Sequence, residues 1–329
     1  MRSESVRALL LGLVLAAGCK PSPHRPDAGP PWWKPAPGEA ADWDIQLAPP
    51  FDLSAPRAMY TLDLWDVVPA DTTLDYGDGA PLVVPKGASS GAIADLHGRA
   101  TPAIVVCHIG GGSIRLDDPD AKKFPGYAGG NPPNRPDPVA AGSVIGWSTT
   151  PTDANERFID IHQAARTTVA ALIGKRIELA KMIGCDAVAA KDTDLPAYQG
   201  AGQIGHGFTD LSLAEYLSWS EELSTRAHEL VVSLGIRNKS LLGSDTLAAT
   251  CDWTMIDRCA EFYQDDCSAA RPFLNLRKAA FAIEYRTSEE GAATDPAMLC
   301  TDLQRAGIKD GIIKSSTELS YAADYMRCM

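Results

Sequence analysis

One stretch of the chain, residues 176–194, contains the end of a helix, a helix stop, a short strand and a polar turn in direct succession. Apolar side chains recur at helical spacing up to Ile183, and Gly184 stands where a left-handed residue ends many helices. The run from Asp186 to Ala190 is too short for another helix and predicts a strand. This order is typical of one repeat of a (β/α)₈ barrel, in which residues after each strand line the ligand site.

The same alternation of strands and helices continues along the chain. The pattern predicts nine strands, at residues 43–47, 59–65, 103–109, 158–161, 186–190, 231–236, 253–256, 279–284 and 311–313. Helical patterns lie between most of the later strands, and Ser212 with Glu215 forms a capping box that opens one of them. Eight or nine such repeats favour closure over an open sheet, so we expect an α/β fold, a TIM-like (β/α)₈ barrel of about 250 residues.

The charge of the chain restricts the ligands it can bind. The net charge is −12 and the isoelectric point is about 4.9. Nucleic acid binding requires a basic face, so we expect no nucleic acid partner and a neutral or cationic ligand. The sequence has no His-Glu-x-x-His motif and no clustered His and Cys residues, so we also expect no metal site. We expect a monomer.

The N-terminus has the pattern of an exported lipoprotein. Arg2 and Arg7 precede an apolar run that is too short to span a membrane, and Cys19 follows Leu-Ala-Ala-Gly. This resembles the bacterial lipobox, which implies a signal peptide at residues 1–18, lipid on Cys19, and a position in the cell envelope. Lys20 after the cysteine favours the outer membrane by the same resemblance. An ordinary signal peptide is the alternative.

Residues 19–39 contain seven prolines after Lys20 and no apolar periodicity. Such a composition predicts an extended, solvated tether that holds the domain away from a membrane, with the folded domain at residues 40–329. Export also places the seven other cysteines in a compartment where disulfides persist. Because Cys107 and Cys185 each lie in an apolar, strand-like run, we interpret both as buried small hydrophobic residues.

A series of short motifs lies along residues 43–328. They are 43–47 (WDIQL), 60–66 (YTLDLWD), Ser113, 119–125 (PDAKKFP), 156–161 (ERFIDI), 179–188 (LAKMIGCDAV), 207–208 (GF), 227–228 (AH), 235–238 (GIRN), Cys259 with Cys267, and 281–285 (FAIEY). No motif is specific alone, but their order and spacing are. Together they resemble the endo-α-1,4-polygalactosaminidases, glycoside hydrolase family 114.

This resemblance implies cleavage of an α-1,4-linked galactosamine polymer by two acids at strand ends, without a cofactor. One carboxyl protonates the leaving oxygen and the other attacks the sugar or activates water. The family's first acid aligns with Lys191 without a gap and with Asp192 if one residue is inserted. The second acid, a Glu in the family, aligns with Asp257. These departures predict weak or absent hydrolysis, with Asp192 and Asp257 as the acid pair.

Other polar residues at strand ends are candidates for substrate binding. Glu284 and Tyr285 end one strand, and we expect both to point toward the barrel mouth, because a Glu there is costly unless it is paired. Arg237 and Asn238 could pair with an acid or order the rim. The full set of expected ligands is Asp63, His108, Lys191, Asp194, Arg237, Asn238, Glu284 and Tyr285.

The family resemblance also implies two disulfides, Cys259–Cys267 and Cys300–Cys328. It leaves Cys107, Cys185 and Cys251 reduced or partly paired. Two functions remain open at this stage. One is a surface glycoside hydrolase acting on an amino-sugar polymer, and the other is a lipoprotein that holds a polysaccharide without cutting it.

Overall fold

The computed structural model describes residues 31–129, 133–134, 139–150, 154–199, 205–238, 241, 244–262, 266–288, 291–315, 317, 319–320 and 325–328. The expected signal peptide, Cys19 and most of the tether therefore lie outside the described residues. From Trp32 onward the chain forms one compact unit. Among the helices in the described part of the chain, none has the length and apolar character that a membrane span requires.

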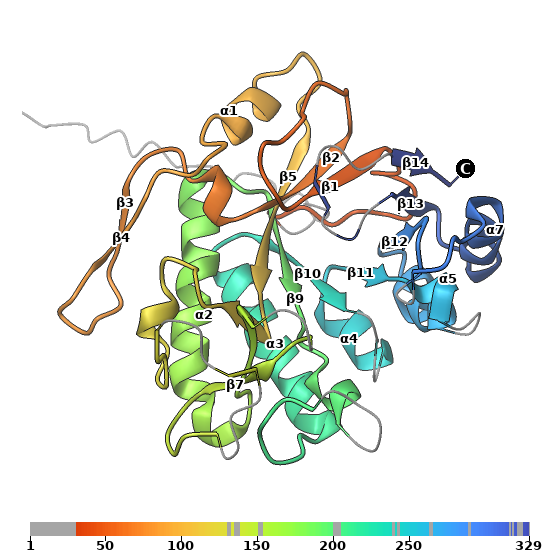
Figure 1. Cartoon of the computed structure of the whole chain (residues 1–329). Helices are drawn as coiled ribbons and strands as arrows, with labels where there is room; N and C mark the ends of the chain where they lie inside the picture. The colour runs from red at the N-terminus through yellow and green to blue at the C-terminus, as the bar shows by residue number, and fades with distance from the viewer. Residues whose placement is uncertain are drawn as a thin grey trace, which may run out of the picture. The chain divides into compact units, whose positions relative to one another are not determined.

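Eight parallel strands form the centre of this unit and nearly close into a barrel (Figure 1). They confirm the TIM-like α/β fold expected from the sequence. In sheet order the strands are β1 (Trp43–Gln46), β2 (Met59–Asp63), β5 (Ile104–Gly110), β9 (Ala187–Lys191), β10 (Ser233–Asn238), β11 (Trp253–Asp257), β12 (Ala280–Tyr285) and β13 (Asp310–Lys314). A ninth strand, β14 (Tyr325–Arg327), pairs antiparallel with β13.

Two small antiparallel sheets are added to the barrel. The loop after β2 forms the hairpin β3 (Thr72–Leu74) and β4 (Leu82–Val84). The second sheet holds β6 (Ser113–Arg115), β8 (Glu156–Ile159) and β7 (Ile145–Ser148). The prediction of a barrel strand at 158–161 was therefore wrong, because this segment runs back along β6. Its apolar side chains indicate a strand correctly, but they carry no information about which sheet it joins.

Most helices follow the barrel strands on the outside. They are α1 (Ala92–His97), α2 (Gln163–Ile183), α3 (Leu213–Glu229), α4 (Ser244–Thr250), α5 (Cys259–Phe262), α6 (Arg271–Asn275) and α7 (Pro296–Ala306). Gly184 ends α2 with φ 98°, and Ser212 with Glu215 caps α3 reciprocally, as the sequence predicts. Figure 1 shows α2 and α3 next to each other on one side of the strands.

Alternation along the strands creates two separate hydrophobic cores. On β9, Ala187 and Ala189 pack inside the barrel, whereas Val188 and Ala190 pack outward among the helices. On β11, Trp253 and Met255 likewise face inward. Successive side chains of a strand point to opposite sides, so every second residue belongs to the inner core. The last inward position of each strand therefore lies at the barrel mouth.

The segment 32–38, expected to be part of the tether, instead packs against the N-terminal ends of the strands. The indole of Trp32 donates to Asp252 (3.2 Å) and stacks on His228, with 4.1 Å between the ring centroids. The ring of Trp33 lies 6.0 Å from that of Trp253. Gly38 donates its amide to Asp310 at 2.9 Å. The compact unit thus begins at Trp32, whose indole contacts polar side chains, while the indole of Trp33 packs on the apolar rings of Trp253 and Phe281.

Three disulfides connect the described cysteines. Cys259–Cys267 and Cys300–Cys328 confirm the pairings that the family resemblance implies. Cys107 and Cys185, expected to be buried and either reduced or partly paired, are buried and bridged to each other. Cys107 is an outward residue of β5, and Cys185 precedes the neighbouring strand β9, so strand pairing brings them together. Cys251 is buried and free.

The Cys107–Cys185 disulfide should contribute more to stability than Cys259–Cys267, because it closes a longer loop in the unfolded chain. The separations are 78 residues for Cys107–Cys185 and 8 for Cys259–Cys267. Chain entropy then predicts losses of about 4.5 and about 2.5 kcal/mol for the respective double Cys→Ala variants. Urea unfolding of both variants measures this order, and peptide mapping identifies the bonds. Equal losses, or free thiols at 107 and 185, would contradict the assignment.

Candidate functional site

Lys191 occupies the mouth of the barrel at the end of β9. It continues the inward series of Ala187 and Ala189, and its ammonium lies 2.6 Å from Glu156 Oε1 and 3.4 Å from Asp192 Oδ2. Burial alone would lower the pKa of Lys191, but the two carboxylates raise it overall. The residue therefore remains a charged ammonium, and it stands where the family alignment without a gap places an acid.

Asp192 directly follows the strand and has φ 56°, a left-handed conformation that is uncommon for a residue with a Cβ. Its Oδ2 accepts a hydrogen bond from Ser113 Oγ at 2.8 Å. A glycine turn packs closely against it, since a Cβ on Gly112 would lie 1.8 Å from the carbonyl oxygen of Asp192. The glycine-rich run after His108 thus allows the turn after β5 to support the end of β9.

Asp192 and Glu156 share the ammonium of Lys191 unequally. Burial raises the pKa of Asp192, while Lys191 lowers it and the Glu156 charge raises it further. Burial would also raise the pKa of Glu156, but its pair with Lys191 lowers that pKa overall. The ammonium lies closer to Glu156, so a proton added to this cluster resides on Asp192.

Asp257 ends β11 at the last inward position. Its Oδ2 pairs with Arg237 Nη2 at 2.7 Å, and its Oδ1 accepts from the hydroxyl of Tyr285 at 3.2 Å. Arg237 Nη1 lies 3.0 Å from His108 Nε2. Burial, followed by the charges of Arg237 and Lys191, holds the pKa of His108 well below its usual value, so a neutral imidazole accepts this hydrogen bond. The four side chains connect β5, β10, β11 and β12.

The charges of both candidate acids affect the pKa of two further side chains, Arg237 and Tyr198. The pKa of Arg237 is raised by Asp257 and Asp192, against the effect of burial. Burial raises the pKa of Tyr198, and the charges of Asp194, Asp192, Asp257 and Glu156 raise it further. Contacts agree with this, because the amide of Asp192 donates to the carbonyl of Arg237 at 3.3 Å and the Arg237 guanidinium pairs with Asp257 at 2.7 Å.

A cavity of about 400 Å³ opens beside this cluster at the ends of β2, β5 and β9. Asp63, the last inward residue of β2, lies in its wall, and its Oδ1 accepts from the amide of Trp65 at 3.0 Å. Burial, then the charges of Asp118 and Asp66, raises the pKa of Asp63 to about 7. The lining residues are Leu47, Ala48, Pro49, Asp63, Trp65, Asp66, His108, Arg115, Asp117, Asp118, Pro119, Glu156 and Lys191.

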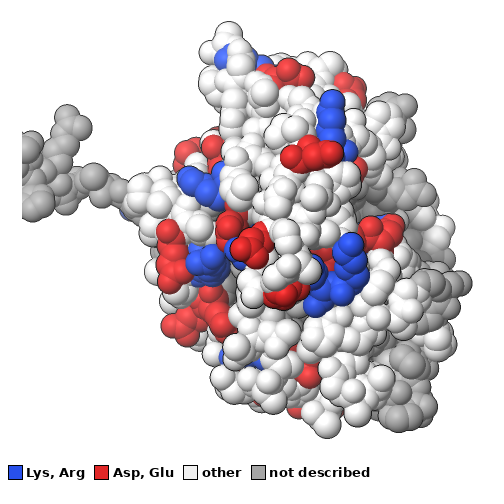
Figure 2. All heavy atoms as spheres, turned by 90° about the vertical axis from the view of Figure 1, so that its left-hand side faces the viewer, with Lys and Arg blue, Asp and Glu red and all other residues white. Residues whose placement is uncertain are grey.

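The wall of this cavity carries both charge signs. Arg115 pairs with Asp117, and the buried guanidinium of Arg176 holds Asp118 at 2.9 Å. Figure 2 shows acidic and basic side chains next to one another on the face of the molecule that it presents. These charged side chains are therefore paired with one another within the protein.

Six of the residues predicted from sequence come together at the mouth, namely Asp63, His108, Lys191, Arg237, Asp257 and Tyr285, and Asp192 adjoins them. Asn238 does not, because it is one residue out of the inward register. Its amide bonds Thr193 and the hydroxyl of Tyr216. Asp194 is fully buried, on the turn after β9. Both belong to the support of the site.

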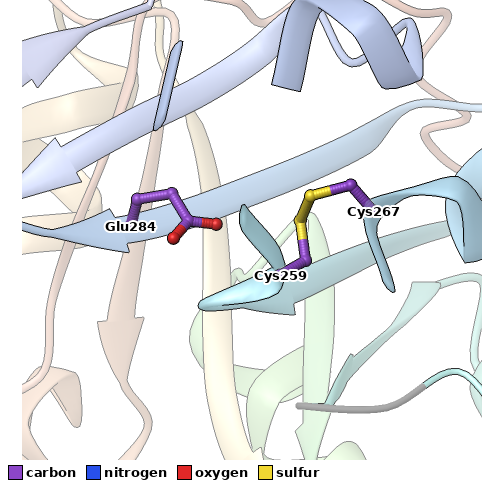
Figure 3. A group of neighbouring side chains, drawn as sticks. All are labelled: Cys259, Cys267 and Glu284. Carbon is purple, nitrogen blue, oxygen red and sulfur yellow. A yellow bond between two sulfur atoms is a disulfide. The ribbon is translucent and has the colours of Figure 1, made fainter. Parts of the chain in front are cut away.

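Glu284 also points away from the mouth, contrary to the expectation that it lies beside Tyr285 there. It is completely buried, and its Oε1 accepts from the amide of Ala260 at 2.9 Å. Figure 3 shows its carboxyl directed toward the disulfide of Cys259 and Cys267. A carboxylate oxygen and both sulfur atoms lie within 4.8 Å of one another, but bridged sulfurs are not thiolate ligands.

Glu156 and Ser113 are site residues that reasoning from strand ends missed. Both come from the small antiparallel sheet, on β8 and β6, and only this sheet carries them to the end of β9. The residues that carry the family resemblance include both of them. A carboxylate and a hydroxyl within strand-like runs are the sequence features from which both could have been predicted as site residues.

The titration of Asp63 gives a testable pH dependence. Its folded-state pKa of about 7 lies above the ordinary value of 3.8. Its contribution to stability is therefore complete below about pH 3.8 and is lost as the pH rises to about 7. Asp63→Asn should match the wild type in melting temperature near pH 4 and exceed it above pH 7. A difference in melting temperature that does not change with pH would contradict the raised pKa.

Comparisons with known proteins identify the family and support the fold. The sequence model of the glycoside-hydrolase family GH114 matches residues 22–328. No curated protein sequence matches the chain. The crystal structure of Aspergillus fumigatus Ega3 in complex with galactosamine is similar, with a TM-score of 0.62, 20% identity, and coverage of 89% of this chain and 97% of that chain.

More distant barrels resemble the chain only weakly. The isomalto-dextranase of Arthrobacter globiformis T6, in complex with panose, gives a TM-score of 0.44 at 11% identity and covers 80% of this chain and 52% of that chain. The GH26 domain of a Prevotella bryantii endo-β-mannanase/endo-β-glucanase gives 0.43 at 10% identity, with coverage of 87% and 85%.

Proposed function

The chain belongs to glycoside hydrolase family GH114, and from this premise we propose that it cleaves an α-1,4-linked galactosamine-type polysaccharide. The single observation that carries the proposal is that Asp192 and Asp257 both contact Arg237 at the C-terminal ends of the strands. The amide of Asp192 donates to the carbonyl of Arg237 at 3.3 Å, and the Arg237 guanidinium pairs with Asp257 at 2.7 Å. Glycoside hydrolysis requires two carboxyl groups that flank one bond. The cavity is lined by Lys191, which contacts Asp192, and by His108, which contacts Arg237, and it has the size and polarity to hold a sugar residue.

We assign different roles to the two acids from their surroundings. Asp192 takes the proton of its cluster, so it is the group that can protonate the leaving oxygen. Asp257, paired with Arg237 and bonded by Tyr285, is the carboxylate that attacks the sugar or activates water. Asp63 and His108 line the adjacent cavity and bind the sugar.

We further propose that this catalysis is weak. Asp257 stands where the family has a Glu, and its side chain is shorter by one methylene. A misplacement of about 1 Å can cost about a hundredfold in rate. Lys191 also holds Asp192 and Glu156 by ion pairs within the mouth, so a substrate has to share those acids with the ammonium.

Removing either acid should abolish most of the activity. Asp192→Asn and Asp257→Asn are each expected to slow the release of reducing ends from partly deacetylated galactosaminan by about 10²–10⁴-fold, the usual contribution of one acid–base group. Asp186→Asn is the matched control for Asp192. Asp186 lies at the opposite end of β9 from Asp192, away from the mouth, and pairs with His97. Robust cleavage that survives Asp257→Asn would show that the acids are elsewhere.

The alternative is a protein that binds the polysaccharide without cutting it. One observation favours it, the 2.6 Å pair of Lys191 with Glu156 in the place where a catalytic acid is expected. Binding of the same galactosaminan, measured by calorimetry, with no new reducing ends would establish this function. Cleavage by the wild type together with its loss in both acid variants would exclude it.

We also propose that the chain is a lipoprotein anchored to the bacterial cell envelope through Cys19. The support is the Leu-Ala-Ala-Gly-Cys motif after a short apolar run, in residues outside those the structure describes. Intact mass of protein extracted from membranes should show a chain that begins at Cys19 and carries acyl groups. Cys19→Ala should release the protein in soluble form. A mature N-terminus at another residue would contradict the anchor.

A further inference from the structure

Glu284 was expected to contact substrate, but it lies on the outer side of β12, next to the turn that directly follows Asp257. We propose that Glu284 is a positioning residue for Asp257: its carboxyl holds the amide of Ala260 and so fixes the turn that aims Asp257 into the mouth. This inference rests on the proposed function, because it assigns the geometry of one of the two acids.

The end of β12 holds the turn after β11 at three successive residues. The carbonyl of Ile283 accepts from the amide of Arg258 at 2.8 Å. Glu284 Oε1 accepts from the amide of Ala260 at 2.9 Å, and the hydroxyl of Tyr285 donates to Asp257 Oδ1 at 3.2 Å. Because consecutive side chains of a strand point in opposite directions, Glu284 fixes the turn from outside while Tyr285 holds the acid from inside.

The turn needs this restraint. Arg258 has φ 60°, a left-handed conformation that costs free energy for a residue with a side chain. The disulfide Cys259–Cys267 closes the following loop, and its sulfurs lie within 4.8 Å of a Glu284 carboxylate oxygen. Without an acceptor at 284, the amide of Ala260 would be a buried donor without its partner, which destabilises this turn and favours a relaxed one.

The protonation of Glu284 depends in part on the charge of Asp257. Burial raises the pKa of Glu284 to about 8, the hydrogen bond from Ala260 opposes this, and the charges of Asp257 and Glu261 raise it further, with Arg258 acting against them. Among the described residues, Oε2 has no hydrogen-bond partner. Glu284 is thus a neutral acid at pH 6, and its ionisation at alkaline pH would place a second buried negative charge beside Asp257.

Two substitutions separate the parts of this role. Glu284→Gln keeps an acceptor for Ala260 and cannot ionise, whereas Glu284→Met keeps the length of the side chain and removes the acceptor. Asp310→Asn is the matched control. Asp310 is also a buried acid with a raised pKa that accepts a backbone amide, from Gly38, but it lies at the opposite end of the barrel.

We expect Glu284→Met to lower kcat on soluble galactosaminan by about 10–100-fold with KM little changed, since a displaced acid affects the chemical step. Glu284→Gln should retain wild-type kcat at pH 6. Its kcat relative to the wild type should rise as the pH passes 8, because only the wild type acquires the buried charge. For Asp310→Asn the same ratio should stay constant with pH. A kcat that Glu284→Met leaves intact, or a ratio for Glu284→Gln that is flat with pH, would overturn the proposal.

A second measurement keeps this test separate from that of the proposed function. The carboxyl ¹³C resonance of Asp257 should shift or broaden in Glu284→Met and stay in place in Asp310→Asn, whether or not the wild type cleaves the polymer. Hydrogen exchange at the Ala260 amide should quicken only in Glu284→Met. If the wild type is inactive while both signals respond, the proposed function fails and the positioning role stands. If neither signal responds, Glu284 does not hold the turn.

Discussion

A parallel barrel makes every strand place alternate side chains in two different environments, and this constraint determines the character of each residue at the mouth. On β9 the inward series runs from Ala187 through Ala189 to Lys191, and on β11 from Trp253 through Met255 to Asp257. On both strands the charged side chain stands at the last inward position, where side chains of other strands pair with it. The site is therefore located where the apolar interior ends.

Pairing of opposite charges is the second condition that shapes the mouth. Lys191 is held by Glu156 and Asp192, and Asp257 by Arg237, all within a largely buried cluster. Removing one member of such a pair leaves an uncompensated charge, which typically costs 3–5 kcal/mol. Changes at these positions therefore have to be compensated together. The presence of Lys191 at the end of β9 and of Glu156 on β8 is one coupled feature of this chain.

The sequence predicts the barrel well because its signals are local. Helical periodicity up to Ile183, the glycine that ends α2 and the apolar run of β9 all lie within one short stretch. The misplaced strand at 158–161 and the missed Cys107–Cys185 bridge depend on partners that are far apart in the chain, and no local pattern specifies them.

The errors in the site have a physical cause of the same kind. Glu284 and Tyr285 are consecutive, so only one of them can face inward, and the inward series of Phe281 and Ile283 selects Tyr285. The same count along β10 selects Arg237 over Asn238. The two-residue period was present in the sequence and would have separated ligands from supporting residues. Glu156 could not be found in this way, because a separate sheet brings it to the mouth.

The packing of the segment 32–38 across the N-terminal ends of the strands determines where the described chain enters the fold. Trp32, Trp33 and Gly38 fix the start of the fold at the end of the barrel opposite to the mouth. The first described residues therefore do not border the cavity. A substitution within 32–38 would act on the packing at that end of the barrel and leave the side chains of the mouth in contact with one another.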